Sequence, residues 1–159
     1  GIRDRSVYRG LGDVYKRHMF VTLIVGILDL ETGILKLCNA GHNPPILIYP
    51  DGQVSYLEFK TQIFVGVVED FKYSDEEVVL EKESKLFLYT DGVTEAENIN
   101  KELYGEEKLL EMLSDNASSD VRTTVNVVVD SIASHVKEAE ASDDLTILLI
   151  QYEPGTANS

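Results

Sequence analysis

The chain has 159 residues, the length of a single domain with one buried core. Its 28 acidic residues outnumber 14 basic ones, and the net charge of -14 disfavours nucleic-acid backbones and anionic lipids as partners. The single cysteine, Cys38, excludes an internal disulfide, and neither a signal-peptide pattern nor an apolar run of about 18 residues is present. We therefore expect a cytoplasmic protein without membrane contact.

The first ninety residues predict a weak helix followed by strands. Residues 1–18 carry Val7, Leu11, Val14 and Tyr15 at helical spacing. FVTLIVGILD and ILKLCNA, joined by ETG, predict a hairpin, and PILIYP and QVSYLEF, joined by DG, predict another. EVVLE and KLFLYT are a further pair of strand candidates, joined by KES. Because no crossover helix separates these segments, the sheets should be largely antiparallel.

The remaining chain predicts two amphipathic helices and a final strand. One apolar helix face comprises Leu103, Leu109, Leu110 and Leu113, and a second comprises Val125, Val128, Val129, Ile132 and Val136. LTILLI is apolar at nearly every position, which predicts a central strand. The order of elements predicts an α+β fold with helices covering antiparallel sheet. Residues 1–153 should form one domain, and residues 154–159 a polar tail.

Acidic residues stand at two predicted strand ends. Asp91 follows LFLYT, while Asp143 and Asp144 precede LTILLI. If these strands are antiparallel neighbours, Asp91 lies near Asp143 or Asp144, where two charges about 5 Å apart repel by about 3 kcal/mol at an effective dielectric of 20. A hard cation such as Mg²⁺ or Mn²⁺ would offset that repulsion. The alternative is structural, since Asp-Gly is a common turn and SDD can cap a strand junction.

Other catalytic patterns are weaker. His42 lies in NAGHNPP, where the prolines favour an extended loop, so its ring could reach a phosphate or could be structural. No GxSxG elbow is present, and Cys38 lies inside an apolar strand, so a covalent nucleophile is unsupported. Phosphate-binding and dinucleotide-binding glycine motifs are absent from the sequence.

Six segments occur in order between about residue 19 and residue 152: MFVTLIVGILDLETG, NAGHNPP, FVGV, LFLYTDGVTEAEN, YGEEKLLEML and SDDLTILLI. This set resembles the stage II sporulation protein E branch, the sigma-factor regulation serine phosphatases, of the metal-dependent, type 2C-like protein phosphatases. The resemblance implies two antiparallel sheets between helices, in α-β-β-α layers. It also implies a centre of two Mn²⁺ or Mg²⁺ ions, at which metal-activated water attacks phosphoserine.

The resemblance assigns roles residue by residue. Asp91 and Asp143 match the family's metal-ligand aspartates and are the catalytic candidates, while Asp144 is the secondary candidate for metal binding. The supporting residues around this site would be Asn39, Gly41, His42, Thr90, Gly92 and Glu95.

One family motif has no counterpart. Gly-Asp-x-x-Gly-x-Gly, whose aspartate helps bridge the two metals, is absent, and Gly12-Asp13-Val14 lacks the later glycines. The chain therefore resembles the C-terminal two-thirds of a phosphatase domain. We expect this part alone to hold one cation or none, to show little turnover, and to form a homodimer that covers exposed sheet.

Three functions remain open. The first is a bacterial protein serine/threonine phosphatase acting in signal transduction. By resemblance, its substrate is a phosphorylated anti-anti-sigma-type regulator, and a sensor or response-regulator domain precedes it. The second is a non-catalytic interaction or regulatory module of the same fold, which the missing motif favours. The third is a general two-metal hydrolase of small phosphate esters.

Overall fold

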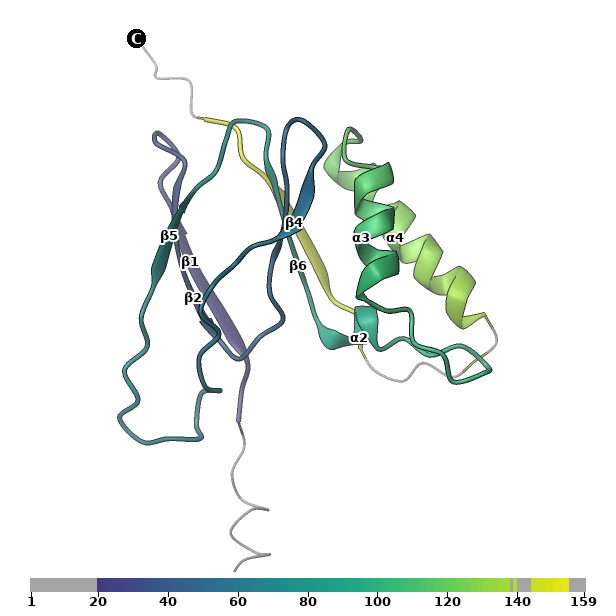
Figure 1. Cartoon of the computed structure of the whole chain (residues 1–159), viewed down its shortest axis with the longest axis horizontal. Helices are drawn as coiled ribbons and strands as arrows, with labels where there is room; N and C mark the ends of the chain where they lie inside the picture. The colour runs from purple at the N-terminus through teal and green to yellow at the C-terminus, as the bar shows by residue number, and fades with distance from the viewer. Residues whose placement is uncertain (1–19, 138, 140–143, 155–159) are drawn as a thin grey trace, which may run out of the picture.

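The computed structural model describes residues 20–137, 139 and 144–154, which form two antiparallel sheets and a set of helices. In Figure 1 the three-stranded sheet, the four-stranded sheet and the two long helices form successive layers from left to right. The predicted opening helix lies outside the described residues. Among the described residues, no helix combines the length and apolar content that a membrane span requires.

The three-stranded sheet has the order β1-β2-β5. The predicted first hairpin is confirmed, because β1 (Leu23–Leu28) pairs antiparallel with β2 (Ile34–Ala40). Strand β5 (Glu76–Val79) pairs antiparallel with the other side of β2. On the outer face of this sheet Lys36 and Glu77 form an exposed ion pair at 2.8 Å.

The four-stranded sheet has the order β4-β3-β6-β7. The second predicted hairpin is confirmed as β3 (Ile46–Ile48) and β4 (Val54–Tyr56). Its turn contains Gly52 at φ +93°, a conformation that glycine adopts without strain. Strand β6 (Lys85–Tyr89) lies between β3 and β7 (Ile147–Gln151), antiparallel to both.

The core has one apolar cluster on each face of the four-stranded sheet. Alternate residues of a strand point to opposite faces, so β6 gives Leu86 to the space between the sheets and Phe87 to the helix side. The cluster between the sheets contains Leu35, Leu37, Leu47, Leu57, Leu80, Leu86 and Tyr152. The helix-side cluster includes Ile46, Ile48, Phe87, Tyr89, Val93, Leu109, Leu113, Val128, Ile132 and Leu149.

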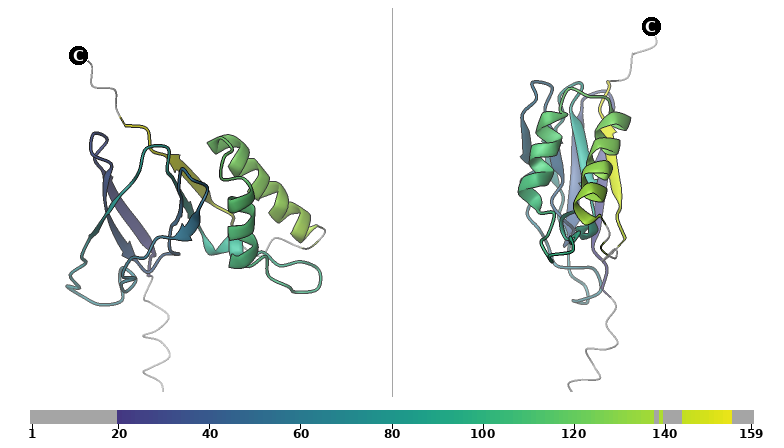
Figure 2. Two further views of the ribbon diagram at one scale, coloured as in Figure 1. Left: turned by 45° about the horizontal axis from the view of Figure 1, so that its top comes forward. Right: turned by 90° about the vertical axis from the view of Figure 1, so that its right-hand side faces the viewer.

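Helices α3 (Glu106–Asp115) and α4 (Val121–Val136) cover the helix-side cluster, as Figure 2 shows from the side. The N-cap of α4 is Asp120, whose side chain accepts a hydrogen bond from the Thr123 amide at 3.0 Å. The placement of Leu103 on the first helix was wrong. Leu103 lies before α3, where it forms an isolated bridge with Glu97. The helix begins only after Gly105, because the φ of +82° at Gly105 is not helical.

Two further strand predictions need correction. Segments EVVLE and KLFLYT contain β5 and β6, which lie in different sheets, so the connection between them crosses from one sheet to the other. The predicted central strand LTILLI contains β7, which lies at the edge of its sheet among the described strands. Its inner face is apolar but open: Leu148 is 54% exposed. Of the implied α-β-β-α arrangement, the described residues form three layers, β-β-α.

Candidate active site

Asp91 ends the β6 segment and begins the short helix α2 (Asp91–Thr94). Thr90 before it is extended, and the Glu95 amide donates to the Asp91 carbonyl at 2.8 Å to close the helical turn. The Asp91 side chain is exposed, and its Oδ1 accepts a hydrogen bond from the Gly92 amide at 3.1 Å. The turn therefore leaves carboxylate oxygen available to a ligand, so the structural and the metal-binding interpretations are compatible.

The predicted pairing of the two strands that carry the aspartates is confirmed. Tyr89 pairs with Ile147, and the Thr90 amide donates to the Thr146 carbonyl at 3.1 Å. The Thr90 hydroxyl adds two contacts: it donates to the Asp144 carbonyl at 3.3 Å and accepts the Thr146 amide at 3.1 Å. Thr90 thereby fixes the start of the β7 segment against the end of β6.

Gly92 permits a close approach of α2 to the segment before β7. A Cβ at Gly92 would overlap the Asp144 carbonyl oxygen and lie 3.0 Å from its carbonyl carbon. The Asp144 backbone is thus packed on the first turn of α2, next to Asp91, with the Asp144 side chain exposed. Asp143, the other ligand candidate, lies outside the described residues, so its distance from Asp91 stays a prediction.

The donors among the described residues suit a hard cation, but they do not complete a site. Carboxylate oxygens are ligands that Mg²⁺ and Mn²⁺ prefer, and the exposed Asp91 supplies them, whereas the Asp144 carbonyl accepts the Thr90 hydroxyl. Within residues 20–137, 139 and 144–154, no group of three or more His, Cys, Asp or Glu side chains could hold a metal ion. Further ligands must come from elsewhere if two cations are to bind.

The NAGH loop is held by its asparagine. The buried Asn39 side chain accepts the His42 amide at 2.8 Å and donates to the His42 carbonyl at 2.9 Å. Gly41, at φ +75°, packs against the Phe64 ring, where a Cβ would clash. His42 Nδ1 lies 3.1 Å from the Thr22 hydroxyl. Asn39 and Gly41 therefore shape the loop, and the His42 ring contacts Thr22 while the His42 backbone contacts Asn39.

The loop and Asp91 lie at the same end of the four-stranded sheet. The loop leads into β3, whose first residue, Ile46, pairs with Phe87 near the end of β6. In an antiparallel pair, the start of one strand lies beside the end of the other. The structure thus brings Thr90, Asp91 and Gly92 against Asp144, with Glu95 at the end of the same turn and the NAGH loop along the same edge.

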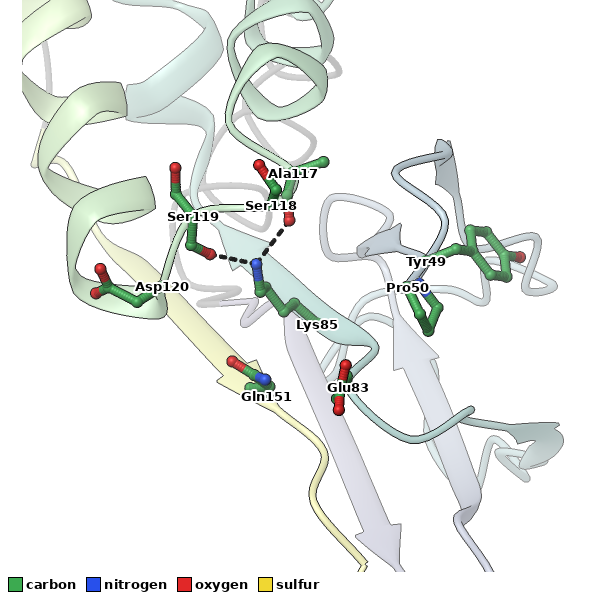
Figure 3. A pocket seen from close by; sticks show the side chains of 9 residues that line it. All are labelled: Tyr49, Pro50, Glu83, Lys85, Ala117, Ser118, Ser119, Asp120 and Gln151. Carbon is green, nitrogen blue, oxygen red and sulfur yellow. Dashed lines mark hydrogen bonds between the residues drawn. The ribbon is translucent and has the colours of Figure 1, made fainter.

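A buried lysine at the opposite end of β6 was missed by sequence reasoning. Figure 3 shows Lys85 pointing to the connection between α3 and α4, where its Nζ donates to the carbonyls of Ala117, at 2.7 Å, and Ser119. Lys85 is 6% exposed, and this burial lowers the pKa of its ammonium group. It borders a pocket of about 400 Å³. The only signal in the sequence is a lysine opening an apolar strand.

Comparison with known proteins places this geometry in a family. A family model described as stage II sporulation protein E (SpoIIE) matches residues 4–153. Protein IcfG of Synechocystis sp. is 29% identical over 132 residues, which cover 83% of this chain and 20% of IcfG. Phosphoserine phosphatase RsbU of Bacillus subtilis is 24% identical over 156 residues, which cover 95% of this chain and 46% of RsbU. The chain thus spans less than half of these curated relatives.

Solved structures share the fold. The structure of the RsbU and RsbW domains of Rv1364c from Mycobacterium tuberculosis has a TM-score of 0.67 and 25% identity, and the match covers 85% of this chain and 37% of that one. The Mn-presoaked phosphatase domain of SpoIIE from Bacillus subtilis has a TM-score of 0.65 and 15% identity, with 94% and 62% covered. RsbX in complex with magnesium has a TM-score of 0.54 and 22% identity, with 82% and 55% covered. The predicted α+β fold class is confirmed.

Proposed function

Because the chain belongs to the stage II sporulation protein E family of PP2C-type phosphatases, we propose that it forms part of a protein serine phosphatase that hydrolyses phosphoserine. The observation that carries the proposal is the pairing of β6 with β7. This pairing sets the first turn of α2, which begins at Asp91, against the Asp144 backbone, and Asp143 precedes Asp144 in the sequence. The phosphatase domain would extend to residue 153, with residues 154–159 as a polar tail.

The proposed cofactors are two Mn²⁺ or Mg²⁺ ions in the complete site. Asp91 and Asp143 would hold them, with Asp144 as the secondary candidate. The cations would neutralise the phosphoryl oxygens and lower the pKa of an attacking water. Two residues of this chain would position the segments that carry the ligands. Thr90 joins the two strand ends, and Gly92 lets the Asp144 backbone approach α2. The Mn-presoaked SpoIIE structure and the RsbX structure in complex with magnesium support this choice of cations.

The proposed substrate is a phosphorylated regulator of the anti-anti-sigma type. Two observations support this class: the similar RsbU is a phosphoserine phosphatase, and Rv1364c carries RsbU and RsbW domains. The match covers 46% of RsbU, so more than half of that relative lies outside the matched part. We propose that a sensor or response-regulator domain likewise precedes this phosphatase domain in the full-length protein. The reaction would take place in the bacterial cytoplasm, where a sigma-factor regulator would meet the enzyme.

The test is hydrolysis of a phosphoserine peptide and of a chromogenic phosphate ester across a Mn²⁺ titration. It uses this chain and a form extended upstream to the length of the similar phosphatase domains. We expect little turnover by this chain, Mn²⁺-dependent turnover by the extended form, and loss of that turnover with Asp91→Asn. Asp51→Asn is the matched control, because Asp51 also precedes a glycine but stabilises a hairpin turn by accepting the Gln53 amide at 2.9 Å. Full activity of the Asp91→Asn form would remove Asp91 as a ligand.

A second candidate function is a non-catalytic module that keeps the fold and binds a regulator. The observation that favours it is the missing Gly-Asp-x-x-Gly-x-Gly motif, since its aspartate would help to bridge the two metals. The two candidate functions predict different results for hydrolysis by the extended form. A folded, extended chain that gains no Mn²⁺-dependent hydrolysis would support the non-catalytic module.

A further inference from the structure

The connection between α2 and α3 carries two exposed apolar side chains on an ordered hairpin. Ile99 is 70% exposed and Leu103 is 53% exposed. In Figures 1 and 2 this connection extends outward from the end of the molecule at which α2 lies. We call Ile99, Leu103 and the first turns of α3 from Glu106 to Glu111 the docking surface.

Hydrogen bonds hold the hairpin in its conformation, while the apolar side chains of Ile99 and Leu103 stay exposed. Asn98 is central: its amide donates to the Glu102 carbonyl at 3.0 Å, and its side chain accepts the amides of Asn100 and Glu102 at 2.8 and 3.1 Å. Lys101 forms an ion pair with Glu97 at 2.8 Å. A partner would therefore meet a preformed loop and would bear little of the entropic cost of ordering it.

The docking surface is tied directly to the helix that begins with Asp91. The Tyr104 amide donates to the Ala96 carbonyl at 2.8 Å, and the Gly105 amide donates to the Thr94 carbonyl at 2.9 Å. Thr94 is the last residue of α2, which starts at Asp91. A protein bound to the docking surface thus lies next to the candidate active site.

The charge of the docking surface selects a basic partner. A pocket of about 740 Å³ opens at the start of α3, lined by Leu103, Tyr104, Gly105, Glu106, Glu107, Lys108 and Glu111. The lining thus contains three carboxylates and one ammonium group. That ammonium group, Lys108 Nζ, lies over the Tyr104 ring, 4.9 Å from its centre. None of the three ion pairs among the described residues includes these glutamates. A second copy, at net charge -14, would bring like charge to this surface.

We propose that the docking surface binds the phosphoprotein substrate, through an apolar side chain that contacts Leu103 and Ile99 and through lysine or arginine residues that meet the glutamates of α3. This inference rests on the proposed function, because it makes the partner the substrate of the adjacent site. The apolar contacts supply affinity, and the charges supply orientation and selectivity.

The test measures binding to this 159-residue chain without added cation, by fluorescence anisotropy of labelled peptides. One peptide carries phosphoserine with leucine and lysine neighbours, and the other has glutamate in place of each lysine. We expect the lysine peptide to bind more tightly, and Ile99→Ser combined with Leu103→Ser to weaken its binding by about tenfold or more. Glu107→Gln combined with Glu111→Gln should weaken it and reduce its dependence on salt. Leu30→Ser is the matched control, because Leu30 is 59% exposed in the β1–β2 turn at the opposite end.

Three results would overturn the docking surface: equal binding of both peptides, unchanged binding by both double variants, or an equal loss with Leu30→Ser. A change in oligomeric state caused by the Ile99 and Leu103 changes, measured by sedimentation, would assign the surface to a second copy and would also overturn it. Circular dichroism checks that each variant folds. If the serine double variant does not fold, the binding measured with the glutamine double variant decides the test. Failure of the proposed function is separate, because it appears as missing hydrolysis of the chromogenic ester by the extended chain while peptide binding persists.

Discussion

At Gly92, the absence of a side chain controls how closely two segments meet. A Cβ there would overlap the Asp144 carbonyl, whereas a Cβ at Gly26 would meet the flexible Leu35 side chain at 3.3 Å. We expect Gly92→Ala to lower the free energy of unfolding by about 1 to 3 kcal/mol, because backbone must move to admit the methyl group. Gly26→Ala is the control and should have a smaller effect. Urea denaturation measures both, and equal stability of the Gly92→Ala and parent chains would contradict this packing.

The residues at the site were predictable to different degrees. Thr90, Asp91 and Gly92 belong to a sequence pattern in which an Asp-Gly break at the end of an apolar strand predicts a turn, while the roles proposed for them in the site come from the family resemblance. The hydrogen bond from the Thr146 amide to the Thr90 hydroxyl was not predictable, because it depends on the register of β6 against β7. Register is a relation between segments far apart in sequence, and no local pattern encodes it.

At the scale of elements, Lys85 joins strand β6 to the connection between α3 and α4. It donates to two backbone carbonyls, and Lys85→Met would leave both without this partner. We expect a loss of about 1 to 3 kcal/mol in the free energy of unfolding. The control is Lys36→Met, whose ion pair with Glu77 is exposed on both sides and should contribute much less to stability than the buried Lys85 contacts, because solvent screens exposed charges. Equal losses in thermal or urea unfolding would show that Lys85 does not hold this connection.

The hairpins and long helices could be predicted because their signals are local. The Asp51-Gly52 turn is confirmed, and so is most of the predicted apolar face of α4. Val125, Val128, Ile132 and Val136 lie in or against the helix-side cluster, whereas Val129 was wrongly included, because it is 39% exposed. The position of β7 could not be predicted, because an apolar strand indicates burial on both faces but does not identify its neighbours. Leu103 continued the spacing of leucines in α3, but that helix begins three residues later, at Glu106, with Gly105 as its N-cap.

At the scale of the whole molecule, each sheet exposes apolar side chains on an edge strand. Strand β1, at the edge of its sheet among the described strands, has Val25 and Ile27 exposed by 51% and 71%, and β7 exposes Leu148 by 54%. Edges of this kind favour pairing with another chain. We expect this chain to form homodimers with increasing concentration, as sedimentation velocity would measure.

Ile27→Lys should shift that equilibrium to the monomer, because it places a charge on the apolar edge. Val129→Lys is the control, since Val129 is 39% exposed on α4, away from this edge. A parent chain that stays monomeric at high concentration would contradict the expected self-association.

The proposed phosphatase site requires Asp91 and Asp143 to hold divalent cations at the end of β6. The decisive measurement is anomalous diffraction at the manganese edge, from Mn²⁺-soaked crystals of the chain extended upstream. We expect manganese peaks within coordination distance of the Asp91 and Asp143 carboxylates, and their loss with Asp91→Asn. Manganese bound elsewhere, or peaks that persist without the Asp91 carboxylate, would rule this site out.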